Sequence, residues 1–225
     1  MAARPDRGKR PYQQTVRAER AAATRAAIRA AATELFTAQG YAATSLRQVS
    51  QRAGVAERTV YAVYPNKPTL FNDCLAVAIR GAEGSPPLAV SPQTRQMLAD
   101  PDPHRVLSSA VHVAADLLDR AGDLIMVSVE AAGADPDMRA AADAGSAATH
   151  ANQLALAQHL QELGALRPGV NAAAAADILF TLASPHVHQL LRRHRGWSSR
   201  RYRTWLRTTL EHQLLAPPQA GPRAP

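Results

Sequence analysis

A glycine between two short helical segments is the feature that most restricts how this chain can fold. Helical patterns are predicted at about 45–52 and about 57–63, and Gly54 permits a tight turn between them because glycine tolerates a left-handed backbone. Ser50 is small, which lets the two helices approach closely. The apolar positions that would hold the pair together are Val49, Val55 and Val60. We interpret residues 44–67 as a helix-turn-helix, a motif whose second helix lies in the major groove of DNA.

A longer amphipathic helix precedes this motif. Apolar side chains recur three and four residues apart within residues 17–39, which places them on one buried face, and Gly40 ends the helix. These side chains are Ile28, Ala31, Ala32, Leu35 and Phe36. Thr44 is the predicted N-cap of the next helix. Pro65 stops the third helix, and a fourth is predicted at about 66–80.

The rest of the chain is also predicted to be helical. Residues 81–103 contain five prolines and two glycines, which is typical of a linker, and leave room for a short helix at about 94–99. Longer helical segments follow at about 104–120, 122–133, 137–164, 171–194 and 198–215. Alanine is abundant, aromatic residues make up only 4%, and no alternating apolar pattern indicates a strand. We therefore predict an all-α fold.

Charge is distributed unevenly along the chain. Residues 1–80 hold 13 Lys and Arg against 5 Asp and Glu, whereas residues 81–180 hold 5 against 12, and residues 181–225 hold 8 against 1. A basic N-terminal third indicates a polyanion such as DNA as the partner, although a basic tail can also serve solubility alone.

Several other classes of protein are disfavoured. No run of 18 apolar residues predicts a membrane span, and the N-terminus lacks the apolar stretch of a secretory signal. A single cysteine, Cys74, excludes an internal disulfide framework and fits a reducing cytoplasm. The sequence has no Gly-rich phosphate loop or nucleophile elbow, so we expect neither an enzyme nor a cofactor. His186 and His188 are two residues apart and point to different helix faces, so no metal site is predicted.

The stretch GYAATSLRQVSQRAGVAERTVYAVYPNKPTLF resembles the N-terminal domain of the tetracycline-repressor-like (TetR) family of transcription regulators. The shared features are a Gly-aromatic end to the first helix, a Thr-Ser start to the second, a Gly-Val turn, a Thr-apolar-Tyr recognition helix and an Asn-Lys start to the fourth. They cover residues 24–75. The resemblance implies an N-terminal three-helix helix-turn-helix DNA-binding domain and a C-terminal helical domain for ligand binding and dimerisation.

The same resemblance implies a cytoplasmic homodimer that regulates transcription, in most such proteins as a repressor. It would bind a pseudo-palindromic operator in double-stranded DNA and respond to a small-molecule effector. A non-sequence-specific DNA-organising protein is the alternative. The predicted parts are a disordered basic arm (1–16), the helix-turn-helix domain (17–65), a connecting helix (66–83), the C-terminal domain (84–216) and a disordered tail (217–225).

The resemblance also assigns the contacts to DNA. The predicted DNA-binding residues are Thr44, Arg47, Glu57, Arg58, Thr59, Tyr61, Val63 and Lys67. Thr44, Tyr61 and Lys67 match phosphate-contacting positions, and Arg47 matches a position that can reach guanine. Glu57 either reads a cytosine amino group or stabilises the N-terminus of its helix.

Two residues of the third helix depart from the family pattern. Ala56 replaces a serine cap, which removes about 1 kcal/mol of helix stability. Val63 replaces a histidine that often contacts the DNA backbone, so that it either weakens phosphate binding or touches a thymine methyl group. Tyr64 is expected to be a core aromatic residue, and Tyr61 could be one as well.

The resemblance places an effector pocket among helices at about 104–120, 122–133 and 146–163. Polar or soft residues within these apolar stretches are the candidate ligand contacts, each of which could instead belong to the core, an interface or the surface. They are His112, Met126, Glu130, His150 and Gln153. The segments 171–194 and 198–215 resemble the helix pair of the family's dimer interface. The arginines at 192–203 are either a solvated face or a second nucleic-acid patch.

Overall fold

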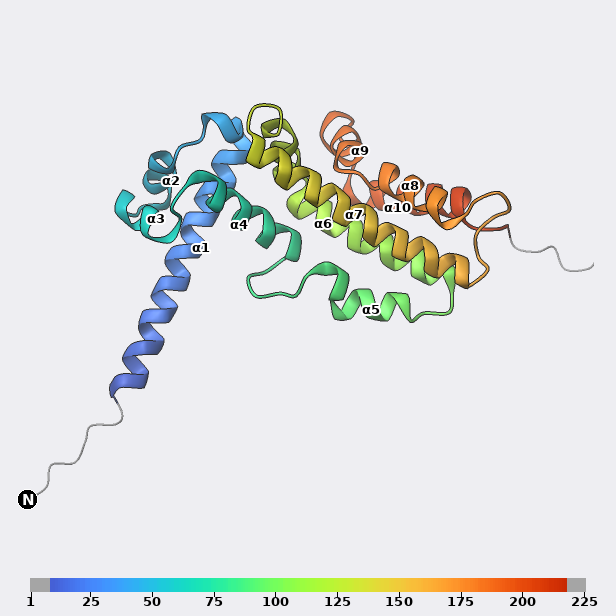
Figure 1. Ribbon diagram of the computed structural model, residues 1–225, viewed down its shortest axis with the longest axis horizontal. Helices are drawn as coiled ribbons and strands as arrows, with labels where there is room; N and C mark the ends of the chain where they lie inside the picture. Colours follow the sequence, from blue (N-terminus) through green and yellow to red (C-terminus); the bar gives the residue numbers. More distant parts are fainter. Residues whose placement is uncertain (1–8, 218–225) are drawn as a thin grey trace, which may run out of the picture. The chain divides into compact units, whose positions relative to one another are not determined.

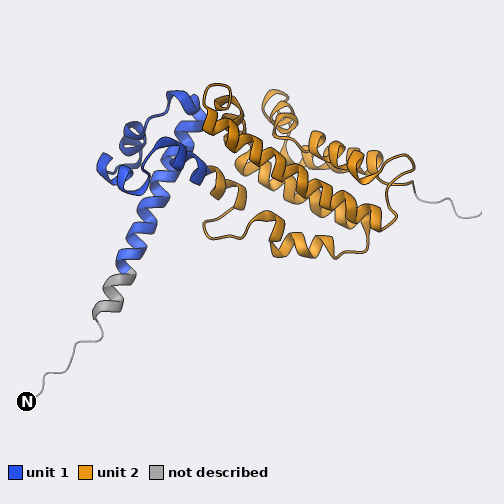
Figure 2. Ribbon diagram, in the orientation of Figure 1, with its two compact units in different colours: residues 1–74 blue, residues 75–225 orange. Residues whose placement is uncertain are grey.

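The computed structural model describes residues 9–217, with side chains from Val16 onward, and shows an all-α protein as predicted (Figure 1). Within these residues the sole strand-like feature is an isolated antiparallel bridge between Leu166 and Leu215. The chain separates into two compact units between Cys74 and Leu75 (Figure 2). That boundary falls inside one helix, α4 (Lys67–Arg80), so α4 contributes to both units. No helix in the described part of the chain is both long and apolar enough to cross a membrane.

The first unit contains α1 (Lys9–Ala43), α2 (Leu46–Ala53), α3 (Glu57–Val63) and the start of α4.

The first helix begins at Lys9, so residues 9–16 are helical and the prediction of a disordered arm was wrong for them. Pro11 does not prevent this because it lies in the first turn, where a missing N–H costs no hydrogen bond. The remaining arm residues, 1–8, lie outside the described part. Gly40 adopts φ 81°, which interrupts α1 where the sequence predicted its end.

The core of the first unit is built around three aromatic rings from α1 and α4. The ring centroid of Phe71 lies 5.0 Å from that of Phe36 and 5.4 Å from that of Tyr41, both in edge-to-face geometry. The other fully buried apolar side chains are Ile28, Ala32, Val49, Val60 and Leu70. Leu35 and Val55, also predicted to be buried, are only partly covered.

The second unit begins with short elements, η1 (Leu88–Val90) and α5 (Pro92–Leu98). The long helices α6 (Pro103–Ala131) and α7 (Pro136–Glu162) follow, and then α8 (Ala172–Leu182), α9 (Pro185–Gln189), the π-helical turn η2 (Leu190–His194) and α10 (Ser199–Leu214). α6 packs against α7, α9 and α10, and α8 packs against α7 and α10. The fully buried members of the shared core include Leu107, Ala115, Ala157, Leu160, Ala175, Tyr202, Leu206 and Leu214.

Two helix boundaries differ from the sequence prediction. Residues 104–120 and 122–133 form one helix rather than two, and Gly122 is buried inside α6 against the ring of His188. A Cβ atom at Gly122 would lie 3.5 Å from His188 Nδ1, which is an ordinary packing contact, and the helix continues through this glycine without a break. Conversely, residues 171–194 are not one helix, because Ser184 caps a new helix that begins at Pro185.

Prolines in the second unit start helices. Each of four helices has a capping side chain at its N-cap followed at once by a proline, which has no N–H to leave unsatisfied. The pairs are Ser91–Pro92, Asp102–Pro103, Asp135–Pro136 and Ser184–Pro185. The proline-rich stretch 81–103 is therefore not a structureless linker: it holds η1 and α5 and sets the start of α6.

Candidate nucleic-acid interface

The turn between α2 and α3 has the geometry that the sequence predicted. Gly54 adopts φ 67° and ψ 28°, the left-handed conformation, and its N–H donates to the carbonyl of Gln51. The N–H of Val55 donates to the carbonyl of Ser50 at 3.1 Å, so the two bonds form a Schellman motif that satisfies the end of α2. Ser50 itself is 4% exposed. The turn is therefore closed by backbone bonds, and α2 packs directly on α3.

The N-terminus of α2 is capped by Ser45 and not by Thr44, which corrects the sequence prediction. Ser45 Oγ accepts from the N–H of Gln48, and Gln48 Oε1 accepts from the N–H of Ser45 at 2.8 Å, which is a complete capping box. Thr44 is 2% exposed, and its hydroxyl donates to the carbonyl of Gly40 at 2.8 Å. Thr44 thus closes the end of α1 and presents no hydroxyl to a phosphate.

Sequence reasoning missed Ser45 and Gln48, although a signal was present. Gln48 stands three residues after Ser45, which is the spacing of a capping box, whereas the residue three after Thr44 is Arg47. Ser45, Arg47 and Gln48 are all exposed at the beginning of α2. Helix N-termini attract anions, so these three side chains surround a suitable position for a backbone phosphate.

The third helix turns one side to solvent. Glu57, Arg58 and Tyr61 are exposed, with Tyr61 at 51%, whereas Val60 on the opposite side is fully buried. Thr59 and Val63 are partly covered at the margin. The N-cap of α3 is Ala56, which makes no side-chain hydrogen bond, and Glu57 places a carboxylate in the first turn, where the helix dipole favours it.

The guanidinium groups of two arginines in the helix-turn-helix have no intramolecular partner among the described residues. These arginines are Arg47 on α2 and Arg58 on α3, and both are exposed. Arg52, at the end of α2, differs from them because it donates to Glu34 Oε2 of α1 at 2.8 Å. Free guanidinium groups beside the exposed face of α3 are suited to phosphate oxygens and guanine edges.

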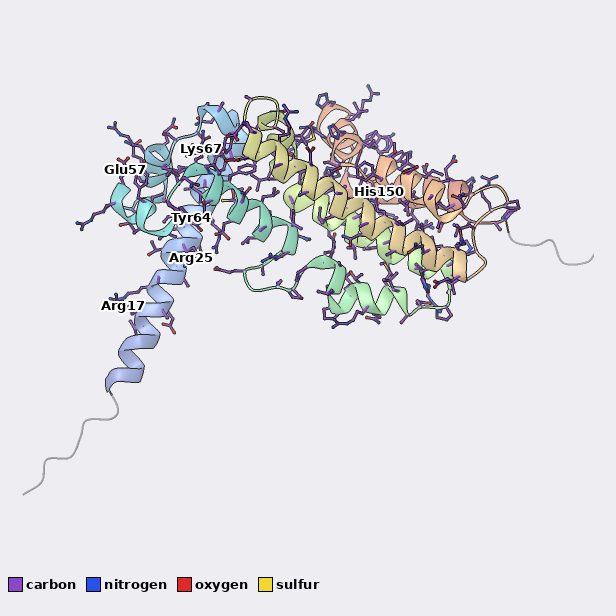
Figure 3. All side chains as sticks on the ribbon, in the orientation of Figure 1. Arg17, Arg25, Glu57, Tyr64, Lys67 and His150 are labelled. Carbon is purple, nitrogen blue, oxygen red and sulfur yellow. The ribbon has the colours of Figure 1, made fainter. Side chains whose placement is uncertain are left out.

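Tyr64 is a core residue, as expected from the sequence, and it links the helices behind this face (Figure 3). Its hydroxyl donates to Asp73 Oδ2 at 2.5 Å, and Arg29 of α1 donates to the same oxygen at 3.2 Å. Burial, together with the neighbouring Asp73 carboxylate, raises the pKa of Tyr64 above its ordinary value. Burial also raises the pKa of the Cys74 thiol to about 11, so this cysteine stays protonated and unreactive.

Lys67, at the first position of α4, makes intramolecular contacts. Its ammonium donates to the carbonyl of Tyr41 at 2.9 Å and lies 4.3 Å from the centroid of the Tyr41 ring. Lys67 is partly exposed, so one lysine joins the start of α4 to the end of α1. A phosphate contact by Lys67 remains a prediction.

The structure does not gather the five candidate ligand contacts into one site. His112 is exposed and lines a groove between α6 and α10. His150 lies 3.2 Å from Asp177 and packs its ring on Phe180. Met126 is half-buried on α6, and Glu130, one turn further on, is exposed. Gln153 Oε1 is buried without a hydrogen-bond donor among the described residues.

The chain is similar to known proteins at two levels. The family described as "Bacterial regulatory proteins, tetR family" matches residues 28–74, which run from the core of α1 through α2 and α3 to the middle of α4. No curated protein matches the chain in sequence.

Solved structures share the fold over nearly the whole chain. A transcriptional regulator from Saccharomonospora viridis in complex with choline aligns with TM-score 0.69 and 18% identity, covering 87% of this chain and 100% of that one. NalD from Pseudomonas aeruginosa, described as the secondary repressor of a multidrug efflux pump, aligns with TM-score 0.65 and 24% identity, covering 88% and 98%. A complex of SmeT with triclosan aligns with TM-score 0.65 and 19% identity, covering 90% and 98%. Residues 28–74 therefore match the tetR family of bacterial regulatory proteins, and the chain shares its fold with solved structures of transcriptional regulators.

Proposed function

We propose that this chain is a homodimeric, ligand-responsive repressor that places α3 of each subunit in a major groove of a pseudo-palindromic operator. The observation that carries the proposal is the division of α3 into a buried side at Val60 and a solvent side at Glu57, Arg58 and Tyr61. The unpaired guanidinium groups of Arg47 and Arg58 support it. A two-fold dimer would read half-sites about one helical turn apart, roughly 34–36 Å, or at a longer compatible spacing.

The outer face of α10 supports dimerisation. Trp197 and Trp205 line a surface hollow of about 550 Å³ on this helix, in which Arg201 stacks over the Trp197 ring at 4.1 Å. Leu190, in the neighbouring turn η2, is 54% exposed. Large aromatic and apolar side chains at a surface are typical of an interface between subunits.

A ligand response is supported by two of the similar structures, which contain choline and triclosan. In this chain, Arg120 of α6 donates to the carbonyls of Ala78 and Ile79 in the last turn of α4. A ligand that displaced α6 would therefore pull on α4, which continues into the DNA-binding unit. Such a ligand must bind the DNA-free conformation more tightly than the DNA-bound one.

The experiment is selection of bound sequences from random duplex DNA by the full chain, followed by footprinting. We expect an enriched inverted repeat whose binding survives a large excess of random duplex DNA. A pool without an enriched motif, or loss of all binding to the competitor, would contradict the proposal and favour the DNA-organising alternative.

Oligomeric state is tested separately by sedimentation equilibrium. Leu190→Glu should shift the protein towards monomer, whereas Val90→Glu, a matched exposed apolar position in η1 at 52%, should leave the mass unchanged. A monomeric wild-type protein would contradict the dimer.

A further inference from the structure

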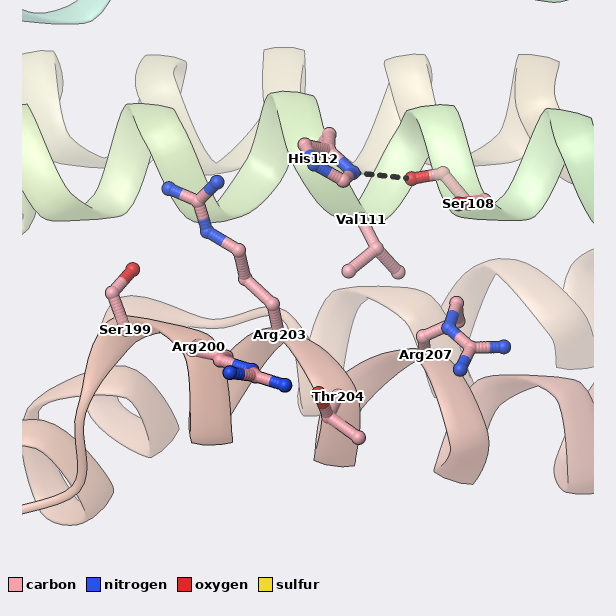
Figure 4. Close-up of a pocket in the computed structure, with 8 residues that line it drawn as sticks. All are labelled: Ser108, Val111, His112, Ser199, Arg200, Arg203, Thr204 and Arg207. Carbon is pink, nitrogen blue, oxygen red and sulfur yellow. Dashed lines mark hydrogen bonds between the residues drawn. The ribbon is translucent and has the colours of Figure 1, made fainter.

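A groove with an arginine-rich lining lies between α6 and α10 in the second unit (Figure 4). Its volume is about 500 Å³, within the range of small-molecule sites. It is lined by Ser108, Val111, His112, Ser199, Arg200, Arg203, Thr204 and Arg207. Three arginines, a histidine and three hydroxyl groups therefore face a space with no acidic side chain in its lining.

The basic side chains come from one flank of α10. Arg200, Arg203 and Arg207 recur three and four residues apart, so they share one side of that helix. Figure 4 shows Arg203 reaching from α10 towards α6, while Val111 points from α6 towards α10. Val111 is 2% exposed and gives the groove an apolar floor.

Carboxylates hold two of these arginines from outside the lining. Arg203 Nη2 donates to Asp116 Oδ1 at 2.5 Å, and Arg207 Nη1 donates to Glu211 Oε1 at 3.0 Å. These pairs orient the guanidinium groups without using all of their donors. In particular, Arg203 Nε is buried and has no acceptor among the described residues. A buried N–H without an acceptor is costly, and a bound oxygen would satisfy it.

The third arginine, Arg200, is unpaired within the subunit and also lines the hollow beside Trp205 that we propose as part of the subunit interface. Arg200 is exposed, and no ion pair or hydrogen bond links it to the described part of the chain. Thr204 is exposed beside it, and Ser108 is partly buried across the groove on α6. His112 Nδ1 lies 3.3 Å from the carbonyl oxygen of Ser108, which leaves Nε2 available to a ligand.

From this arrangement we infer that the α6–α10 groove binds a small organic anion, a carboxylate or a phosphate monoester carried on a compact apolar body. The anionic oxygens would lie among Arg200, Arg203 and Arg207, because guanidinium groups bind such oxygens by paired, charge-assisted hydrogen bonds. The apolar body would rest on Val111. The site does not depend on DNA recognition, so its binding is measured without DNA.

The test is titration calorimetry of the full chain with benzoate, phenyl phosphate and benzamide, which share a ring and differ in the charged group. We expect benzoate or phenyl phosphate to bind and neutral benzamide to bind at least about tenfold more weakly. Arg200→Gln combined with Arg207→Gln should weaken the anion at least about tenfold. The control variant, Arg139→Gln combined with Arg195→Gln, removes two exposed arginines elsewhere in the second unit and should bind as the wild type does.

Two further measurements locate the site. Ser108→Phe fills the groove without touching an arginine and should also abolish anion binding. The Nε–H signal of Arg203 in nitrogen–proton NMR spectra, assigned with Arg203→Lys, should shift when the anion is added. Unfolding temperature and sedimentation mass without ligand show that each variant is folded and assembled as the wild type is.

The inference is overturned if neither anion binds, if benzamide binds as tightly as benzoate, or if the arginine double variant retains full affinity. Loss of operator binding in the same protein would contradict the proposed function and leave the calorimetry unaffected. The two failures can therefore be told apart.

Discussion

The chain carries arginines in two very different electrostatic settings. In the helix-turn-helix, Arg47 and Arg58 are exposed and unpaired among the described residues. In the second unit, the basic run after α9 is held by carboxylates of α6: Arg192 pairs with Asp119 at 3.3 Å, and Arg193 pairs with Asp123. Arg203 of α10 is bound to α6 in the same way through Asp116.

The difference shows that a run of basic residues does not by itself define a nucleic-acid surface. Both clusters consist of arginines, and the second cluster is the denser of the two in the sequence. An unpaired arginine offers its whole charge to a DNA phosphate, whereas an arginine held by a carboxylate offers only the donors that the pair leaves free. The comparison favours DNA binding by the first cluster and helix-to-helix attachment by Arg192, Arg193 and Arg203, three of the six arginines of the second, which weakens the idea of a second DNA patch.

The largest expected effect comes from removing the free side chains of α3. Arg58→Ala combined with Tyr61→Ala should weaken operator binding by about 100-fold or more, because both a base contact and a phosphate contact are lost. Both side chains are exposed, so the unfolding temperature should stay near that of the wild type. Fluorescence anisotropy with the selected operator measures the affinity. Footprints equal to those of the wild type would show that α3 is not the reading helix.

In the second unit the corresponding test concerns stability. Asp119 accepts from Ser199 Oγ at 2.6 Å and from Arg192 Nε at 3.3 Å, and it lies 3.1 Å from His188 Nε2. Asp119→Ala should lower the free energy of unfolding by about 2 kcal/mol, because these partly buried partners lose their acceptor. Asp143→Ala removes an exposed carboxylate of α7 and should change it by less than about 0.5 kcal/mol. Denaturant unfolding measures both, and equal values would contradict the role of Asp119.

Local features of the first unit could be predicted from the sequence because their causes lie within a few residues. Gly54 has the left-handed backbone that its type permits, and Val49 and Val60 are buried as their spacing required. The mistaken cap arose because Thr44 and Ser45 are adjacent hydroxyl residues. Their different roles depend on which carbonyl or amide each hydroxyl reaches.

The second unit was harder to predict because its key contacts join distant residues. α6 continues as one helix through Gly122, which is buried beside His188, and no local pattern reveals that contact. Arg192, Arg193 and Arg203 meet carboxylates about 70 to 90 residues earlier in the chain, so their pairing is a consequence of tertiary structure. For the same reason, the candidate ligand residues that were chosen for polarity within apolar helices do not converge.

Lys67 tests, with a smaller expected effect, the same contrast between unpaired basic side chains and basic side chains that make intramolecular contacts. If Lys67 contacts a phosphate, Lys67→Ala should weaken DNA binding similarly on all sequences and reduce the slope of log K against log salt concentration by about one. The contacts of Lys67 with Tyr41 would instead make it a structural link between α1 and α4. Anisotropy titrations at several salt concentrations measure the slope. An unchanged slope with a lower unfolding temperature would assign Lys67 to structure alone.

The smallest expected effect is a dependence of stability on pH that arises from His188. Burial, and then the charge of Arg192, lower the pKa of His188, and the Asp119 carboxylate only partly opposes this. Below the unfolded-state pKa of about 6.5, the unfolded chain therefore binds more protons at this residue than the folded chain does, so acid favours unfolding. Asp119 also has a lowered pKa, because its hydrogen bonds from Ser199 and His188 and the charge of Arg192 outweigh its burial, but its contribution is lost only in more acidic solution. The unfolding temperature should thus fall between pH 7.5 and about pH 5.5, and less steeply in His188→Gln. If both proteins respond equally, the acid sensitivity arises elsewhere than at His188. Tyr64 and Cys74 of the first unit stay protonated throughout this pH range, so the first unit should contribute little to it.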